Sequence, residues 1–443
     1  MENKTKKQQY LIQCQKDLAQ AEKKGSPKEH SLALANYGYA LSINNRRTEG
    51  MDYFDQAEVI AGTDVEDINV MAHGLGLRSL VYQESKRLPD AYQTSAKMLR
   101  LAREEGNTAI ECDAVANQAQ ILLDSGEISG ALRKFQEAET LAKVMGDDER
   151  LMRIKGALGN LSLHAPSLEN AEEYYREALK LAEQIGHTEA EIGFKGNLGS
   201  VLAWQGKHAQ ALEIFEEILP YHQSREDRDQ LIQLLQKMVR SYNSLQNNDQ
   251  VFQHAFQAME MLDDQKDQRV FDFLEPVILA YFREGKNQEA NNMISEAITI
   301  ARSLGDQERE VEFLMNLGES FVASAMNERA LDIYQDALEI TQEIHRPHYQ
   351  THIYGRMGFI YAEMGRLEEA VENHQQAIQL AQEQHQGPLE GNQRSMLALA
   401  YQELGQPQKA REQAQKALDI FQNTGKEQEA EKVQLLLDNL PAD

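Results

Sequence analysis

The chain has 443 residues, of which 71 are acidic and 45 are basic, so its formal net charge is −26. Nucleic acids and anionic membranes attract lysine and arginine, so this charge argues against both as partners and favours a protein partner that carries basic surface. The hydrophobic fraction of 41% suffices for a packed core, while 7% aromatics and a single tryptophan favour helices over sheets.

Cysteine usage and the N-terminus indicate the compartment. The two cysteines, Cys14 and Cys112, are far apart and form no CxxC pair, so neither a zinc site nor a disulfide framework is indicated. The opening residues MENKTKKQQYLIQ lack the apolar core of a secretory signal, and no apolar run approaches the ~18 residues of a membrane helix. We therefore expect a soluble, cytoplasmic protein without a membrane anchor.

The N-terminal residues precede a long repeat. Residues 1–7 are polar and are expected to be disordered. Residues 8–29, which include QQYLIQCQKDLAQAEKK, resemble the second helix of a repeat without its first. We expect them to form an N-terminal capping helix that shields the end of the array from solvent.

From residue 30 to residue 423, one unit of 39 to 41 residues recurs in ten copies. Each copy has an anchor position, occupied most often by glycine. Twelve residues after the anchor, eight copies have alanine, and seven residues further on eight copies again have alanine. The ten anchors are Gly38, Ser79, Ala119, Gly159, Gly199, Val239, Ile278, Gly318, Gly358 and Ala398.

These columns predict a helix pair in each copy. A first helix contains the anchor, and a second helix presents the two alanines on one face, because they are seven residues apart. Glycine recurs where a second helix should end, as at Gly146 and Gly305, followed in both cases by aspartate. Glycine suits the left-handed end of a helix, and aspartate suits the start of the next.

The pattern resembles the tetratricopeptide repeat (TPR), over nearly the whole chain. The ~40-residue period with its NLG anchors is most similar to the long-repeat subclass, which includes kinesin light chain, Pins-type adaptors and bacterial regulators of the maltose-activator and Rap types. The resemblance implies an all-α, right-handed superhelical solenoid of ten helix–turn–helix repeats with capping helices. It also implies that the first helices line the concave side and that the chain is an interaction scaffold.

Two further segments complete the expected organisation. Residues 424–443 resemble a first helix without its second and are expected to form a C-terminal capping helix. Between residues 220 and 290, bulky Val239 and Ile278 replace the small anchor and Pro276 enters a first helix. This departure indicates a seam or hinge between two lobes, although ordinary drift of a repeat explains it equally well.

No catalytic constellation is recognisable. The sequence has no phosphate-binding loop, no HExxH and no GxSxG, so we expect no enzymatic activity and no cofactor. His348 and His352 have a metal-ligand spacing. Pro347 and the repeat register place His345 and Arg346 at an exposed link, so we expect the histidine pair to be exposed to solvent or to line the groove, without a metal site.

The candidate binding residues lie on the face that the resemblance assigns to the groove. Two positions before the anchor, four copies have asparagine, which helix interiors disfavour. An asparagine side chain has both donors and an acceptor for an extended peptide backbone; alternatively, it bonds a neighbouring repeat and orients the helices. Arginine and lysine on the same face suit carboxylates. The candidates are Asn36, Asn117, Gln120, Arg153, Asn160, Asn197, Lys237, Arg240, Asn316, Glu319 and Arg356.

These features lead to two functional hypotheses. The first is a non-enzymatic adaptor that binds a peptide segment or partner protein in the groove. The alternative is a regulatory sensor, in which a small peptide or ligand changes the superhelix and so controls an effector protein.

Overall fold

The computed structural model describes residues 2–164, 167–225, 227–262 and 267–440, and these form helices and connecting turns without a strand. The chain divides into two compact units, Met1–Arg225 and Glu226–Asp443. Each is described separately below and is called the first or the second unit. Among the described residues, no helix combines the length and the apolar content that crossing a bilayer requires.

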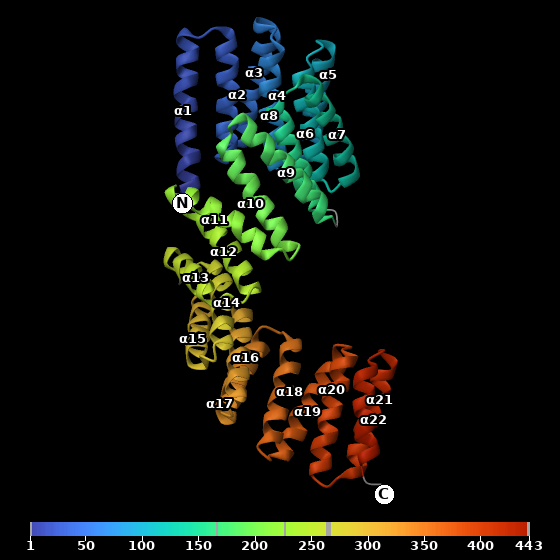
Figure 1. The fold of residues 1–443 in the computed structure, drawn as a ribbon. Coiled ribbons are helices and arrows are strands. Elements are labelled where there is room, and N and C mark those ends of the chain that lie inside the picture. Colours follow the sequence, from blue (N-terminus) through green and yellow to red (C-terminus); the bar gives the residue numbers. More distant parts are fainter. Residues whose placement is uncertain (1, 165–166, 226, 263–266, 441–443) are drawn as a thin grey trace. The chain divides into compact units, whose positions relative to one another are not determined.

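The first unit contains a terminal helix and five helix pairs (Figure 1). A π-helical turn, Ala61–Val65, follows α3. The helices are α1 Glu2–Lys24, α2 Pro27–Ile43, α3 Arg47–Ile60, α4 Ile68–Glu84, α5 Leu88–Glu104, α6 Thr108–Asp124, α7 Ile128–Met145, α8 Asp148–Ser162, α9 Leu168–Ile185, α10 Thr188–Trp204 and α11 His208–Ser224.

The second unit contains five more pairs and ends in a single helix. A 3-10 turn, Gln268–Val270, precedes α14. The helices are α12 Arg228–Ser244, α13 Asn248–Met261, α14 Phe271–Arg283, α15 Asn287–Leu304, α16 Gln307–Ala323, α17 Asn327–Glu343, α18 Pro347–Glu363, α19 Leu367–Glu383, α20 Gly387–Glu403, α21 Pro407–Asn423 and α22 Glu427–Asn439. The predicted all-α architecture of ten pairs between terminal helices is therefore confirmed.

The anchor glycines are sites of close approach between the two helices of a pair. A Cβ built on Gly318 would lie 2.8 Å from Cζ of Tyr334, which is sixteen residues further on in α17. Gly159 meets Tyr175, and Gly358 meets His374, in the same way. An aromatic ring of the second helix thus occupies the space that a side chain at the anchor would need.

The two alanine columns form the other half of this packing. All eight alanines twelve residues after an anchor are fully buried: Ala91, Ala131, Ala171, Ala211, Ala290, Ala330, Ala370 and Ala410. Within each unit the core repeats along the chain, so successive pairs pack against one another as well as within themselves.

The links between copies have the predicted backbone. Gly146 follows α7 with φ +64°, and Oδ1 of Asp147 accepts a hydrogen bond of 2.9 Å from the main-chain N–H of Arg150. Gly305 has φ +69°, and Asp306 accepts from the N–H of Arg309 in the same manner. These contacts satisfy N–H groups that the start of a helix leaves free.

One local expectation differs from the structure, and one departure from the repeat leaves its helix intact. Helix α1 begins at Glu2, so residues 2–7 are helical rather than disordered, because adding a residue to an existing helix gains a hydrogen bond at little entropic cost; residue 1 lies outside the described residues. Pro276 lies inside α14, which remains one continuous helix after the 3-10 turn. The boundary between the units falls at Arg225, between α11 and α12, and a hinge there stays a prediction.

A pair of glycine substitutions tests the close approach. Gly318→Ala should lower the free energy of unfolding by about 1–3 kcal/mol, and with it the midpoint of urea unfolding, because the new methyl group overlaps Tyr334. Gly193→Ala, in α10, should raise stability by about 0.5–1 kcal/mol, because no atom lies within 4 Å of the added Cβ. Circular dichroism during the titration measures both. An unchanged or raised midpoint for Gly318→Ala would contradict the packing.

The buried His374 predicts an acid-sensitive contribution to stability. It is 1% exposed, its Nδ1 lies 2.9 Å from Oε1 of Gln393, and burial lowers its pKa below the usual 6.5. A histidine whose pKa is lower in the folded than in the unfolded protein contributes its full stability above the unfolded pKa. This contribution is lost as the pH falls from the unfolded pKa through the folded pKa. His374→Phe should therefore gain stability relative to wild type from about pH 7.5 to about pH 5.5. Unfolding curves that keep a constant difference across this range would show that His374 does not carry the effect.

Candidate ligand-binding groove

Three consecutive first helices, α4, α6 and α8, form the walls of a cavity of about 440 Å³ in the first unit. Met98 and Phe135, from the second helices α5 and α7, lie beneath it, and Ala116 and Ala157 line it. Because first helices of successive repeats lie side by side, residues about 40 positions apart in the sequence face one space.

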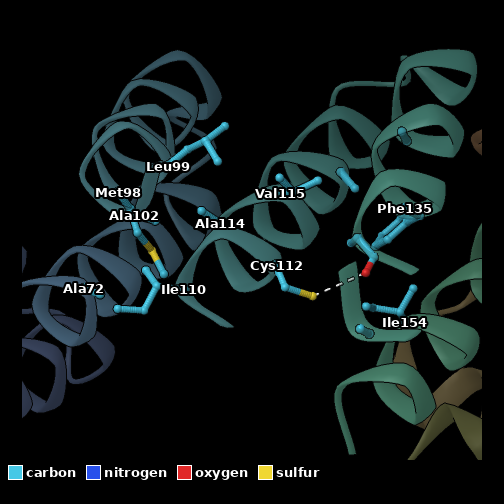
Figure 2. Close-up of a cluster of buried hydrophobic side chains, with 14 of the residues drawn as sticks. Ala72, Met98, Leu99, Ala102, Ile110, Cys112, Ala114, Val115, Phe135 and Ile154 are labelled. Atoms are coloured by element: carbon cyan, nitrogen blue, oxygen red, sulfur yellow. Dashed lines mark hydrogen bonds between the residues drawn. The ribbon is translucent and has the colours of Figure 1, made fainter. Parts of the chain in front are cut away.

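The floor of the groove belongs to the core of the first unit. Figure 2 shows Cys112 of α6 among the buried side chains of this cluster, near Phe135 and Ile154. The Cys112 thiol donates a hydrogen bond of 3.4 Å to the main-chain oxygen of Ala138, and burial raises its pKa to about 11. The thiol is therefore a packed core group and not a reactive one.

Two of the predicted residues place polar groups on the middle helix. Nε2 of Gln83 donates a hydrogen bond of 2.8 Å to Oδ1 of Asn117, which leaves the Asn117 amide N–H groups for other partners. Nε2 of Gln120 donates to Oδ1 of Asp124 at 2.9 Å, which leaves the Gln120 carbonyl oxygen. The two side chains are three residues apart and share a helix face, so α6 offers a donor beside an acceptor.

Two arginines of α8 share one carboxylate of α6. Nε and Nη2 of Arg150 donate to both oxygens of Asp113, at 2.9 and 2.8 Å, and Nη1 donates to Asp147 at 2.5 Å. The Asp113 hydrogen bonds raise the pKa of Arg150. Arg153 has a single, long contact of 3.5 Å to Asp113, and its side chain is 58% exposed. Arg150 therefore links α6 to α8, whereas Arg153 makes only one weak contact with a carboxylate.

The α4 wall is apolar apart from one histidine. Gly76, Leu77 and Leu80 line the cavity, and Leu80 is 43% exposed. Nε2 of His73 lies 2.9 Å from Oδ1 of Asn36 in α2, and burial lowers the pKa of His73. This wall contrasts with the charged α8 wall opposite.

The remaining predicted residues of the first unit lie outside this cavity. Asn36 binds His73 and lines a separate hollow of about 340 Å³ beside α1 and α2. Oδ1 of Asn160 accepts a hydrogen bond of 2.6 Å from the hydroxyl of Tyr175. Asn197 makes no side-chain hydrogen bond to any described residue. Three of these asparagines, counting Asn117, thus use their oxygen to hold another helix.

Among the predicted residues of the second unit, Lys237 and Arg240 lie on α12. Lys237 has no carboxylate within ion-pair distance among the residues that the structure describes, and burial lowers its pKa. Arg240 binds Oδ1 of Asp272 at 2.9 Å.

The other three lie further along the second unit. Asn316 is exposed and forms no side-chain hydrogen bond with the described residues. Glu319 accepts a hydrogen bond of 2.7 Å from the hydroxyl of Tyr334 and forms an ion pair with Arg356. Their role in binding stays a prediction.

The first unit also has a larger cleft, to which we assign no function. It measures about 1,140 Å³ and lies between α3 and α5. Its walls are joined by ion pairs of Arg78 with Asp55 and of Lys97 with Glu58. Acidic and basic side chains line it in equal number, so its charge favours no class of ligand.

Metal binding finds no support in the geometry of the described residues. No group of three or more His, Cys, Asp or Glu side chains among them is arranged to hold an ion. His348 and His352 both lie in α18, and His348 packs against the ring of Tyr349 at 4.1 Å.

Comparisons with known proteins agree with this architecture. Family models described as tetratricopeptide repeat match residues 116–184 and 349–423. The structure is similar to the apo form of RapI, with 14% identity and a TM-score of 0.56, over 81% of this chain and 99% of that one. No curated protein sequence matches the chain. Residues 116–184 and 349–423 are therefore tetratricopeptide repeats, and the helix pairs in the rest of the described chain repeat the same arrangement.

Two other solved structures are less similar. The apo form of the quorum sensor NprR from B. thuringiensis has 14% identity and a TM-score of 0.49, over 78% of this chain and 97% of that one. The TPR-like repeats of a Podospora anserina protein described as a putative kinesin light chain have 19% identity and a TM-score of 0.39. This match covers 45% of this chain and 99% of that one.

Substitution of two asparagines separates structural from free side chains. Asn117→Ala should lower stability by about 1–3 kcal/mol, because the nearly buried Gln83 amide loses its 2.8 Å acceptor and keeps only a 3.5 Å contact with the main-chain oxygen of Ser79. Asn316→Ala, at the same repeat position in the second unit, should stay within about 0.5 kcal/mol of wild type. Urea unfolding measures both, and equal effects would contradict the structural role of Asn117.

Proposed function

We propose that this TPR protein is a non-enzymatic adaptor that binds an extended segment of a partner protein in the groove over α4, α6 and α8. The observation that carries the proposal is the cavity itself, which three successive first helices line and in which a donor, an acceptor and a cation remain available. An extended chain presents N–H and C=O groups that Asn117 and Gln120 can satisfy together.

The charge of the whole molecule adds a second element of recognition. The net charge of −26 favours the approach of a partner whose folded body is basic. The groove differs from this average because it holds Arg153 with only one weak contact. A partner with a basic body and an extended segment satisfies both surfaces.

A regulatory sensor is the second candidate, and one contact favours it. Asp113 links α6 to α8 through Arg150 and also contacts Arg153. A ligand that draws Arg153 away changes the interactions between neighbouring repeats. Small-angle scattering of the protein with and without its ligand distinguishes the candidates, because a sensor changes its radius of gyration and an adaptor keeps it.

Leucines at one repeat position provide the test of the groove. Leu80 and Leu399 both follow an anchor directly and are 43% and 41% exposed, but Leu399 lies on α20 in the second unit. Leu80→Asp should reduce partner recovery in a native pulldown by about tenfold, since a charge then enters an apolar wall. Leu399→Asp should recover the partner as wild type does.

Quantitative mass spectrometry of the recovered proteins reads out this experiment, with circular dichroism to confirm that both variants are folded. If Leu399→Asp loses the partner and Leu80→Asp keeps it, binding belongs to the second unit and the proposed groove is wrong.

A further inference from the structure

The two walls of the groove differ in chemistry. Leu77 and Leu80 make the α4 wall apolar, whereas Asp113, Arg150 and Arg153 make the α6–α8 side charged. A ligand that crosses from α4 to α8 therefore meets an apolar surface first and a charged one last, so the groove has a direction.

Gly76 opens space in the apolar wall. It lies inside α4, where glycine costs about 0.5–1 kcal/mol relative to alanine. No atom lies within 4 Å of a Cβ built on it, whereas Gly318 and Gly159 each face a ring. Packing within the protein therefore does not explain this glycine. The open space beside Leu80 fits an aliphatic side chain of a ligand.

At the α8 wall, the carboxylate partners of the two arginines decide which of them can bind a ligand. Arg150 is held by both oxygens of Asp113 and by Asp147. Arg153 shares Asp113 through one contact of 3.5 Å, too long for a strong hydrogen bond. A carboxylate from a ligand can offer Arg153 two parallel hydrogen bonds and leave the Arg150–Asp113 pair intact.

From these observations we infer the chemical class of the ligand, an inference that rests on the proposed function. The groove recognises an extended peptide with an aliphatic side chain, which lies beside Gly76 and Leu80, and a carboxylate, which binds Arg153. Asn117 and Gln120 contact the backbone between the two. Arg153 attracts the carboxylate at close range, whereas repulsion from exposed acidic groups more than about 8 Å away is weakened by physiological salt.

A selection from displayed random ten-residue peptides tests the ligand class. The immobilised full chain should enrich peptides with Leu, Ile, Val or Met at a constant interval from Asp or Glu. Arg153→Glu should replace Asp and Glu at that position by Lys and Arg, and should bind the original peptides at least about tenfold more weakly. Arg176→Glu is the matched control, because Arg176 is 54% exposed on α9, outside the cavity, and should select as wild type does.

A second variant tests the apolar end of the ligand. Gly76→Leu fills the open space and should shift the aliphatic position of the selected peptides toward Gly and Ala while the acidic position remains. Circular dichroism confirms that each variant is folded before selection.

The outcomes separate the ligand class from the proposed function. If peptides are enriched but Arg153→Glu keeps the acidic preference, the ligand class is wrong and the peptide groove stands. If no peptide is enriched and Leu80→Asp recovers partners as wild type does, both are wrong.

Discussion

The structure depends on one repeated contact, the approach of a second helix to a small residue of the first. At Gly318 and Gly159 the ring of a tyrosine sixteen residues later fills the space of the missing side chain. This contact sets the distance between the two helices of a pair, and buried alanines set the distance on the other face. In the first unit the first helices α4, α6 and α8 of successive repeats contact one another, and the groove is a consequence of their alignment.

The groove shows how a repeating scaffold acquires a specific surface. Residues that hold the scaffold together lie beside residues that remain available. Asn117 uses its oxygen for Gln83 and keeps its amide N–H groups, and Arg150 is committed to Asp113 where Arg153 is not. The proposed ligand contacts are therefore the interactions that the scaffold leaves unused.

The fold could be predicted from the sequence because its cause is local and repeated. A small anchor, an alanine twelve residues later and a glycine at the end of the second helix can all be recognised in the sequence itself. The sequence does not predict the start of α1 at Glu2, because polar residues give no periodic signal for a helix that extends beyond its packed part.

The site was predictable only in part. Asn117, Gln120 and Arg153 belong to the predicted set and line the cavity. Leu77 also lines it, at the repeat position that Asn117 occupies in the next copy, but an apolar residue there gives no sign of binding. The partner of Asn117 lies 34 residues away in the preceding repeat, and no local pattern reveals it. The open space over Gly76 depends equally on the positions of neighbouring helices.

The most direct measurement of the central claim is a crystal structure of the chain with a selected peptide. The account predicts that the peptide crosses α4, α6 and α8 with an aliphatic side chain beside Gly76 and a carboxylate within hydrogen-bond distance of Arg153. A peptide bound along the second helices, or in the second unit alone, would contradict it.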